Sequence, residues 1–64
     1  MRRITTYKGW SIFTRDNGTL AAGKGHDRLI GHTVGQLKQL INKFVKGEYI
    51  PDGLYYKVSN KLKG

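Results

Sequence analysis

The chain has 64 residues, of which 12 are Lys or Arg and four are Asp or Glu, so its formal net charge is +8. A chain of this length forms one small domain (1–64) with a thin core, and the lack of cysteine excludes disulfides and cysteine-ligated zinc. No apolar run has the length of a signal-peptide core or a membrane span, so we expect a cytoplasmic protein that does not enter a membrane.

Residues 10–22 have the pattern of a β-hairpin. Residues 10–15 are rich in aromatic and β-branched types, and Asn17-Gly18 is a strong hairpin signal. A three-residue loop pairs Arg15 with Thr19, whereas a two-residue loop groups Phe13 with the apolar residues of the return strand. We favour the three-residue loop because it gathers more apolar volume on one face. That face then holds Trp10, Ile12, Leu20 and Ala22, and the opposite face holds Ser11, Phe13, Arg15, Thr19 and Ala21.

A second turn is expected over 23–27, where glycines flank Lys24. A short strand over 28–31 follows it. The sheet, over about 7–31, is therefore predicted to be a three-stranded antiparallel meander.

A helix is predicted over about 33–46. Thr33 is a good N-cap residue, Gln36 completes a capping box, and Gly47 suits the residue that ends a helix. The apolar residues recur every three or four positions. They are Val34, Leu37, Leu40, Ile41, Phe44 and Val45.

A short C-terminal element is expected over about 49–59, after the turn signal Pro51-Asp52-Gly53. Alternating apolar residues from Leu54 to Val58 favour a strand, although a spacing of four from Leu54 to Val58 also fits a helix. We favour the strand. The expected fold is α+β, with one amphipathic helix packed across an antiparallel sheet.

The sequence contains few residues that suggest a catalytic function. The two histidines, His26 and His32, are six residues apart, and no metal-ligand set, serine elbow or phosphate loop is recognisable. We therefore expect a protein that is not an enzyme, with no metal, no cofactor and no small-molecule substrate.

The charge favours binding to an acidic partner, since a strongly basic surface attracts polyanions. Nucleic acid is the favoured partner, because basic residues neutralise phosphates and aromatic faces stack on bases. An acidic host protein is the alternative. The oligomeric state stays open. Candidate nucleic-acid-binding residues come from the chain start, the sheet and the helix: Arg2, Arg3, Lys8, Phe13, Arg15, Thr19, Lys24, Arg28, Lys38, Asn42, Lys43 and Lys46.

The segments 18–22 and 28–33, followed by the amphipathic helix, resemble two families of DNA-binding domain. These are the N-terminal domains of tyrosine integrases and the plant ethylene-response factors, which place three strands in the major groove. Leu20 stands where those families have an aromatic residue. The resemblance implies double-stranded DNA as the ligand. It also implies that the contacts are Ser11, Phe13, Arg15, Thr19 and Arg28.

The segment Tyr7-Lys8-Gly9-Trp10 is similar to a hairpin in small basic accessory proteins of bacteriophages and prophages. That resemblance implies either a regulator of DNA events or an inhibitor of a host protein in a bacterial or host cell. Gly25-His26 resembles a segment of hic-type ribonuclease toxins, whose leading helix is missing here. It implies a third hypothesis, a small ribonuclease toxin that uses His26.

Overall fold

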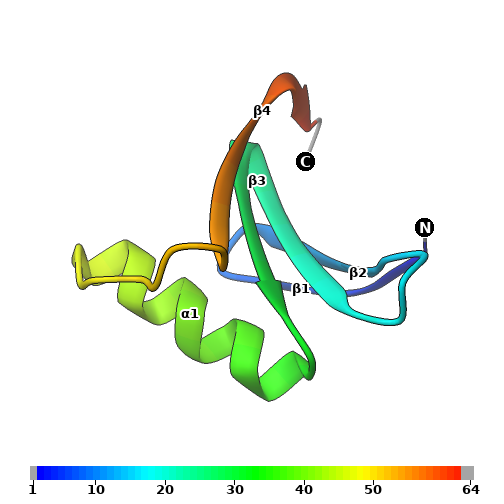
Figure 1. The fold of residues 1–64 in the computed structure, drawn as a ribbon, viewed down its shortest axis with the longest axis horizontal. Coiled ribbons are helices and arrows are strands. Elements are labelled where there is room, and N and C mark those ends of the chain that lie inside the picture. Colours follow the sequence, from blue (N-terminus) through cyan, green and yellow to red (C-terminus); the bar gives the residue numbers. More distant parts are fainter. Residues whose placement is uncertain (1, 63–64) are drawn as a thin grey trace.

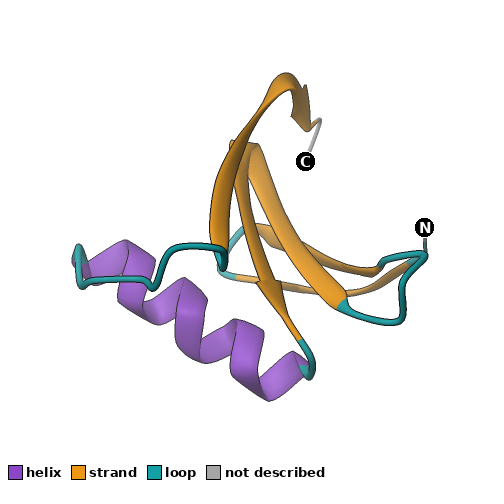
Figure 2. Ribbon diagram, in the orientation of Figure 1, coloured by secondary structure: helices purple, strands orange, loops and turns teal. Residues whose placement is uncertain are grey.

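The computed structural model describes the backbone of residues 2–62 and the side chains of residues 2–59. Its elements in chain order are β1 (Arg3–Tyr7), β2 (Trp10–Thr14), β3 (Leu20–Gly31), α1 (Val34–Lys46) and β4 (Tyr55–Leu62). The strands form one antiparallel sheet in the order β1-β2-β3-β4, and α1 packs against it (Figures 1 and 2). The prediction of an α+β fold with a C-terminal strand is confirmed.

The β2–β3 hairpin has the predicted three-residue loop. Thr14 pairs with Leu20, and the backbone N–H of Arg15 donates to the carbonyl of Thr19 at 2.8 Å. Gly18 ends the loop with a φ of 85°, which a side chain disfavours. This register puts Trp10 and Ile12 into the core, as predicted.

Strand β1 was not predicted, and it extends the sheet back from about residue 7 to Arg3. Its pairing ends at Tyr7 and Trp10, so a two-residue turn joins β1 to β2. Lys8 and Gly9 in that turn have φ values of 51° and 85°, the signs that a type I′ hairpin turn requires. Residues 3–6 of this edge strand are exposed. The strand therefore lacks the alternation of apolar and polar residues from which a strand is predicted.

The predicted turn over 23–27 is wrong, because these residues lie inside the 12-residue strand β3. Residues 20–23 pair with β2, whereas Gly25 and the residues after it pair with β4. The register shifts between Gly25 and Asp27, and Gly25 has a φ of 61°. The glycines therefore bend the strand instead of reversing it. In Figure 1 the first half of β3 rises to the bend, and the second half then runs down toward α1 beside β4; we call residues 25–31 together with β4 the arm.

The ends of α1 match the prediction. The hydroxyl of Thr33 accepts from the N–H of Gln36 at 3.0 Å, and the Gln36 side chain accepts from the N–H of His32 at 2.9 Å. At the other end Gly47 has a φ of 77°, and the N–H of Glu48 donates to the carbonyl of Lys43 at 2.8 Å. These are the bonds of a capping box and a Schellman motif, which satisfy terminal groups of the helix.

The core lies between α1 and the sheet. Leu37, Leu40 and Ile41 are the buried helical residues, and they pack against Trp10, Ile12, Ala22 and Leu29 of the strands. The Phe44 ring meets Trp10 edge-on at 5.2 Å between centroids and lies 5.5 Å from the Tyr55 ring. Phe44 therefore ties the arm to the rest of the sheet. Val45 was predicted to join the apolar stripe but is 62% exposed, so that assignment is wrong.

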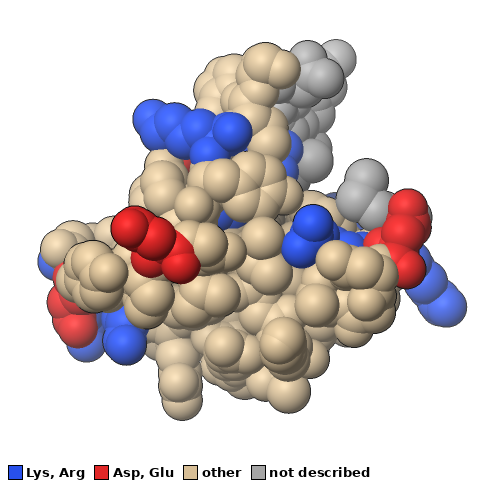
Figure 3. Space-filling model, viewed as in Figure 1, with Lys and Arg blue, Asp and Glu red and all other residues tan. Residues whose placement is uncertain are grey.

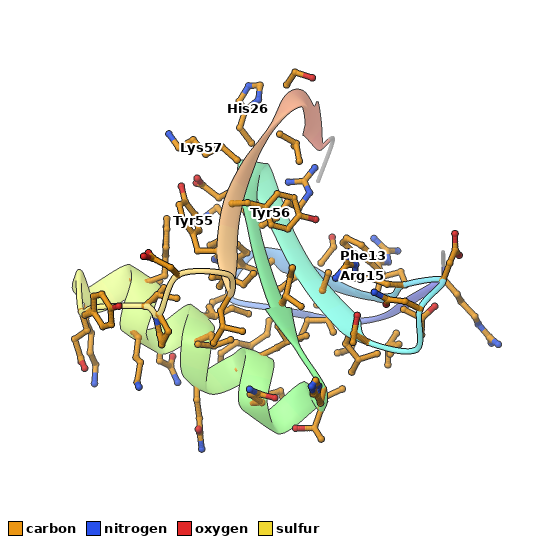
Figure 4. All side chains as sticks on the ribbon, viewed as in Figure 1. Phe13, Arg15, His26, Tyr55, Tyr56 and Lys57 are labelled. Carbon is orange, nitrogen blue, oxygen red and sulfur yellow. The ribbon has the colours of Figure 1, made fainter. Side chains whose placement is uncertain are left out.

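The C-terminal strand begins later than predicted, at Tyr55 instead of about residue 49. Residues 47–54 form the loop that joins α1 to β4 (Figure 2), and the N–H of Leu54 donates back to the carbonyl of Pro51 at 3.2 Å. This turn delays pairing with β3 until after Gly53. Tyr55 and Tyr56 then point to opposite sides of β4 (Figure 4), as a strand requires.

Candidate nucleic-acid interface

Three lysines from different elements come together around the β1–β2 turn. The ammonium of Lys8 donates to the side-chain oxygen of Asn42 on α1, which also accepts from the Tyr7 hydroxyl at 3.3 Å. On the other side of the turn, a Cβ placed on Gly9 would lie 3.5 Å from Nζ of Lys24. The third lysine is Lys38 of α1. We call Lys8, Lys24 and Lys38 the lysine cluster.

Tyr7 holds two members of the cluster in place. The Nζ atoms of Lys8 and Lys38 lie 5.5 Å and 5.3 Å from the centre of its ring, within the range of a cation–π interaction. Lys38 and Asn42 are four residues apart, so they lie on the same flank of the helix and both face the turn. The predicted site residues Lys8, Lys24, Lys38 and Asn42 are thus brought together.

The other two predicted helix residues are placed differently. Lys43 follows Lys38 by five residues, which is about 140° around an α-helix, so it lies on another flank. Lys46 is exposed in the last turn, where both lysines suit the negative end of the helix dipole. Lys43 is therefore a natural comparison residue for the cluster, with the same charge on the same helix.

The face of the sheet turned away from α1 is not the open platform that the resemblance to DNA-binding domains implied. Ser11 and Arg28, two of the predicted contacts, are each only 8% exposed. The Arg28 guanidinium donates to the backbone carbonyls of Gly25 and Asp27, at 2.9 Å and 2.7 Å. Arg28 therefore stabilises the bend of β3, and its use as an exposed phosphate contact is not supported.

The remaining sheet-face residues lie on the inner side of the bend. Figure 4 shows Phe13 and Arg15 there, with Tyr56 of the arm on the same side. Phe13 is half-buried, Tyr56 is 38% exposed, and the Arg15 guanidinium donates to the Thr19 hydroxyl at 3.3 Å. Arg2 and Arg3 are exposed at this end of the β1–β2 ladder, where the carbonyl of Arg2 accepts from the N–H of Thr14. The arginines are thus separated from the lysine cluster by the length of the ladder.

Sequence reasoning did not find the pocket that lies beside the cluster. It has a volume of about 510 Å³ between the arm and the C-terminal half of α1. Its apolar wall is formed by Trp10, Phe44 and Val45, and its other lining residues are Lys24, Gly25, His26, Asp27 and Lys57. Lys57 reaches this place because it pairs with Asp27 across the β3–β4 ladder. That long-range pairing leaves no local signal in the sequence.

No protein-family model, curated protein or solved structure matches this chain.

The one acidic residue that lines the pocket is bonded within the arm. The Tyr55 hydroxyl donates to the Asp27 carboxylate at 2.7 Å. This hydrogen bond raises the pKa of Tyr55 above its ordinary value, with desolvation and the negative charge of Asp27 acting in the same direction. Tyr55 therefore stays protonated at neutral pH and keeps the carboxylate hydrogen-bonded within the arm. Two lysines, Lys24 and Lys57, outnumber this one acidic residue in the lining of the pocket.

The histidines do not form a pair. His26 lies at the bend, where its Nδ1 is 2.9 Å from the carbonyl of Val58, while His32 follows the far end of β3. Because a carbonyl only accepts, Nδ1 is the donor in this contact. Among the described residues, no three potential ligands gather at a metal site.

Within residues 2–62, no helix combines the length and apolar content that crossing a bilayer requires.

Charge is distributed unevenly over the protein. On the face shown in Figure 3, Lys and Arg side chains and a few Asp and Glu side chains are scattered around a broad uncharged area in the lower middle, where α1 lies. The four acidic residues in the sequence are Asp16, Asp27, Glu48 and Asp52. None of them belongs to β1, the β1–β2 turn or α1. The lysine cluster therefore has no acidic residue on the elements from which Lys8 and Lys38 come.

Proposed function

We propose that this protein binds nucleic acid, with double-stranded DNA as the first ligand to test, through the lysine cluster. The observation that carries the proposal is the convergence of Lys8, Lys24 and Lys38 from the turn, β3 and the helix. Three lysines that surround one turn present positive charge there, and the phosphates of a polyanion can neutralise it. A chain with a formal charge of +8 also attracts nucleic acid over a distance.

The contacts in this proposal are to phosphates. Asn42, beside the cluster, is of a residue type that reads adenine edges, but its oxygen already accepts from Tyr7 and Lys8. Lysines that contact phosphates fix position and supply affinity but carry no sequence information. We therefore expect binding that depends strongly on salt and weakly on sequence.

The test is fluorescence anisotropy of a labelled blunt DNA duplex over a series of salt concentrations. The logarithm of affinity should fall linearly with the logarithm of salt concentration, since each phosphate contact releases counterions. Lys38→Gln should reduce the slope by about one. Lys43→Gln removes the same charge from another flank of the helix and should change the slope much less. A duplex that fails to bind at low salt would rule out the proposal.

An acidic protein is the second candidate partner. Tyr49 in the loop after α1 is 76% exposed, and exposed tyrosines are common anchors in protein interfaces. If this partner is the real one, a glutamate-rich peptide will bind more tightly than DNA of equal charge. Tyr49→Ser will then weaken the peptide and leave DNA binding unchanged.

A further inference from the structure

The lysine cluster and the pocket share a residue. Lys24 lies beside Gly9 in the cluster and also lines the pocket between α1 and the arm. A phosphate chain that follows the cluster is thereby led to the mouth of the pocket. The two features therefore form one continuous surface.

The lining of the pocket combines two chemistries. Phe44 and Val45 give it an apolar wall, and Lys24 and Lys57 give it positive charge. Its one acid, Asp27, accepts from Tyr55. It is open to solvent, and its volume of about 510 Å³ is large enough to seat a small organic ligand. A fitting ligand thus carries a flat apolar group and a negative charge within one pocket.

We infer that this pocket binds an unpaired nucleotide, with the base against Phe44 and Val45 and a phosphate near Lys24 and Lys57. The inference rests on the proposed function and names the part of the nucleic acid that the pocket takes. A paired base is stacked inside the duplex and cannot enter the pocket, whereas a base in an overhang or a gap can. An acidic side chain of a protein partner would supply the negative charge, but it has no ring that could pack against the apolar wall.

Trp10 gives a direct readout of the pocket. It is the only tryptophan in the chain, it is 1% exposed, and its side chain lines the pocket next to Phe44. A base seated against Phe44 changes the surroundings of the Trp10 ring. Trp10 emission should therefore change when the pocket is occupied and stay constant when a ligand binds only at the lysine cluster.

The experiment compares two labelled probes, a blunt DNA duplex and the same duplex with a short single-stranded thymidine overhang. The overhang should tighten binding about tenfold, the scale of one stacked base, and it alone should change Trp10 emission. Lys57→Gln and Val45→Glu should each remove most of this preference and leave blunt-duplex binding nearly unaltered. Lys43→Gln, which makes the same change in net charge, should lower both affinities by the same small factor. Circular dichroism of each variant confirms that it is folded.

Two results overturn the inference, and they are distinguishable. Equal binding of the two probes with unaltered Trp10 emission would exclude a nucleotide pocket and leave the proposed function standing. Failure of both probes to bind at low salt would reject the proposed function and the pocket together. A glutamate-rich peptide that changes Trp10 emission with the same affinity as the overhang would show that the pocket recognises charge alone, which also overturns the inference.

Discussion

The side-chain oxygen of Asn42 accepts a hydrogen bond from the ammonium of Lys8, which lies 34 residues earlier in the chain. The contact joins the β1–β2 turn to the middle of α1. Lys8 reaches it with a backbone φ of 51°, a conformation that residues with a side chain rarely adopt. The turn therefore keeps a lysine at a position where glycine or asparagine is less strained.

Replacing Lys8 should separate stability from binding. In Lys8→Asn the turn becomes Asn-Gly, the favoured pair for this geometry, so we expect the free energy of unfolding to rise by up to about 1 kcal/mol. The same change should reduce the salt slope of DNA binding by about one. Urea denaturation and anisotropy measure the two effects. A less stable variant would mean that the bond to Asn42 outweighs the strain.

Alanine substitutions at two glycines near the start of α1 should change the free energy of unfolding in opposite directions. A Cβ on Gly31 would lie 3.1 Å and 3.2 Å from two carbons of Leu37, a completely buried side chain that would have to shift within the packed core. Gly31→Ala should therefore lower the free energy of unfolding by about 1–3 kcal/mol. Gly35 lies in the helix with open space around it, so Gly35→Ala should raise stability by about 0.5–1 kcal/mol. Thermal and urea melts of both variants check the pair.

The bond between Tyr55 and Asp27 predicts an alkaline loss of stability. The folded protein holds the Tyr55 proton more tightly than the unfolded chain does, so its contribution is fully present below the ordinary pKa of tyrosine. It is lost as the pH rises through the raised pKa of Tyr55. Urea midpoints measured from neutral to alkaline pH should fall less steeply in Tyr55→Phe than in the wild type. Tyr49→Phe, at a site 76% exposed, should keep the wild-type slope.

Removing the N-cap of α1 should lower the stability of the protein moderately. Thr33→Ala removes the acceptor for the N–H of Gln36, and we expect a loss of about 1 kcal/mol in the free energy of unfolding. Gln39→Ala, on the exposed side of the same helix, should stay within about 0.5 kcal/mol of the wild type. Alanine has the highest helix propensity, so a loss in Thr33→Ala cannot come from propensity. A Thr33→Ala variant as stable as Gln39→Ala would contradict a role for the cap.

The features that the sequence predicts correctly are local. The helix ends follow from Thr33, Gln36 and Gly47, and the β2–β3 register follows from a loop and its flanking apolar residues. The bend of β3 was mistaken for a turn, because glycine permits both and the choice depends on β4, whose first residue is Tyr55. Pairing between strands that are this far apart in the sequence can be recognised only in the complete fold.

For the candidate site, too, the sequence predicts local properties but not which residues lie close together. The sequence identifies the lysines as candidates by charge, but it does not reveal that Lys8, Lys24 and Lys38 meet around the β1–β2 turn. It also treats Arg28 as an exposed contact, whereas the bend buries it against backbone carbonyls. Side chains that act together here come from segments that meet only after folding.

The arm is a two-stranded ribbon, since the residues of β3 that pair with β4 are not those that pair with β2. Isolated two-stranded ribbons are marginally stable, so this one depends on Leu29 in the core and on Tyr55 packing against Phe44. The backbone amides of β4, which pairs only with β3, should therefore exchange with solvent deuterium sooner than those of β2, through openings of β4 that leave the core intact. Those openings separate the walls of the pocket, so any molecule that occupies it must slow deuterium uptake in the arm.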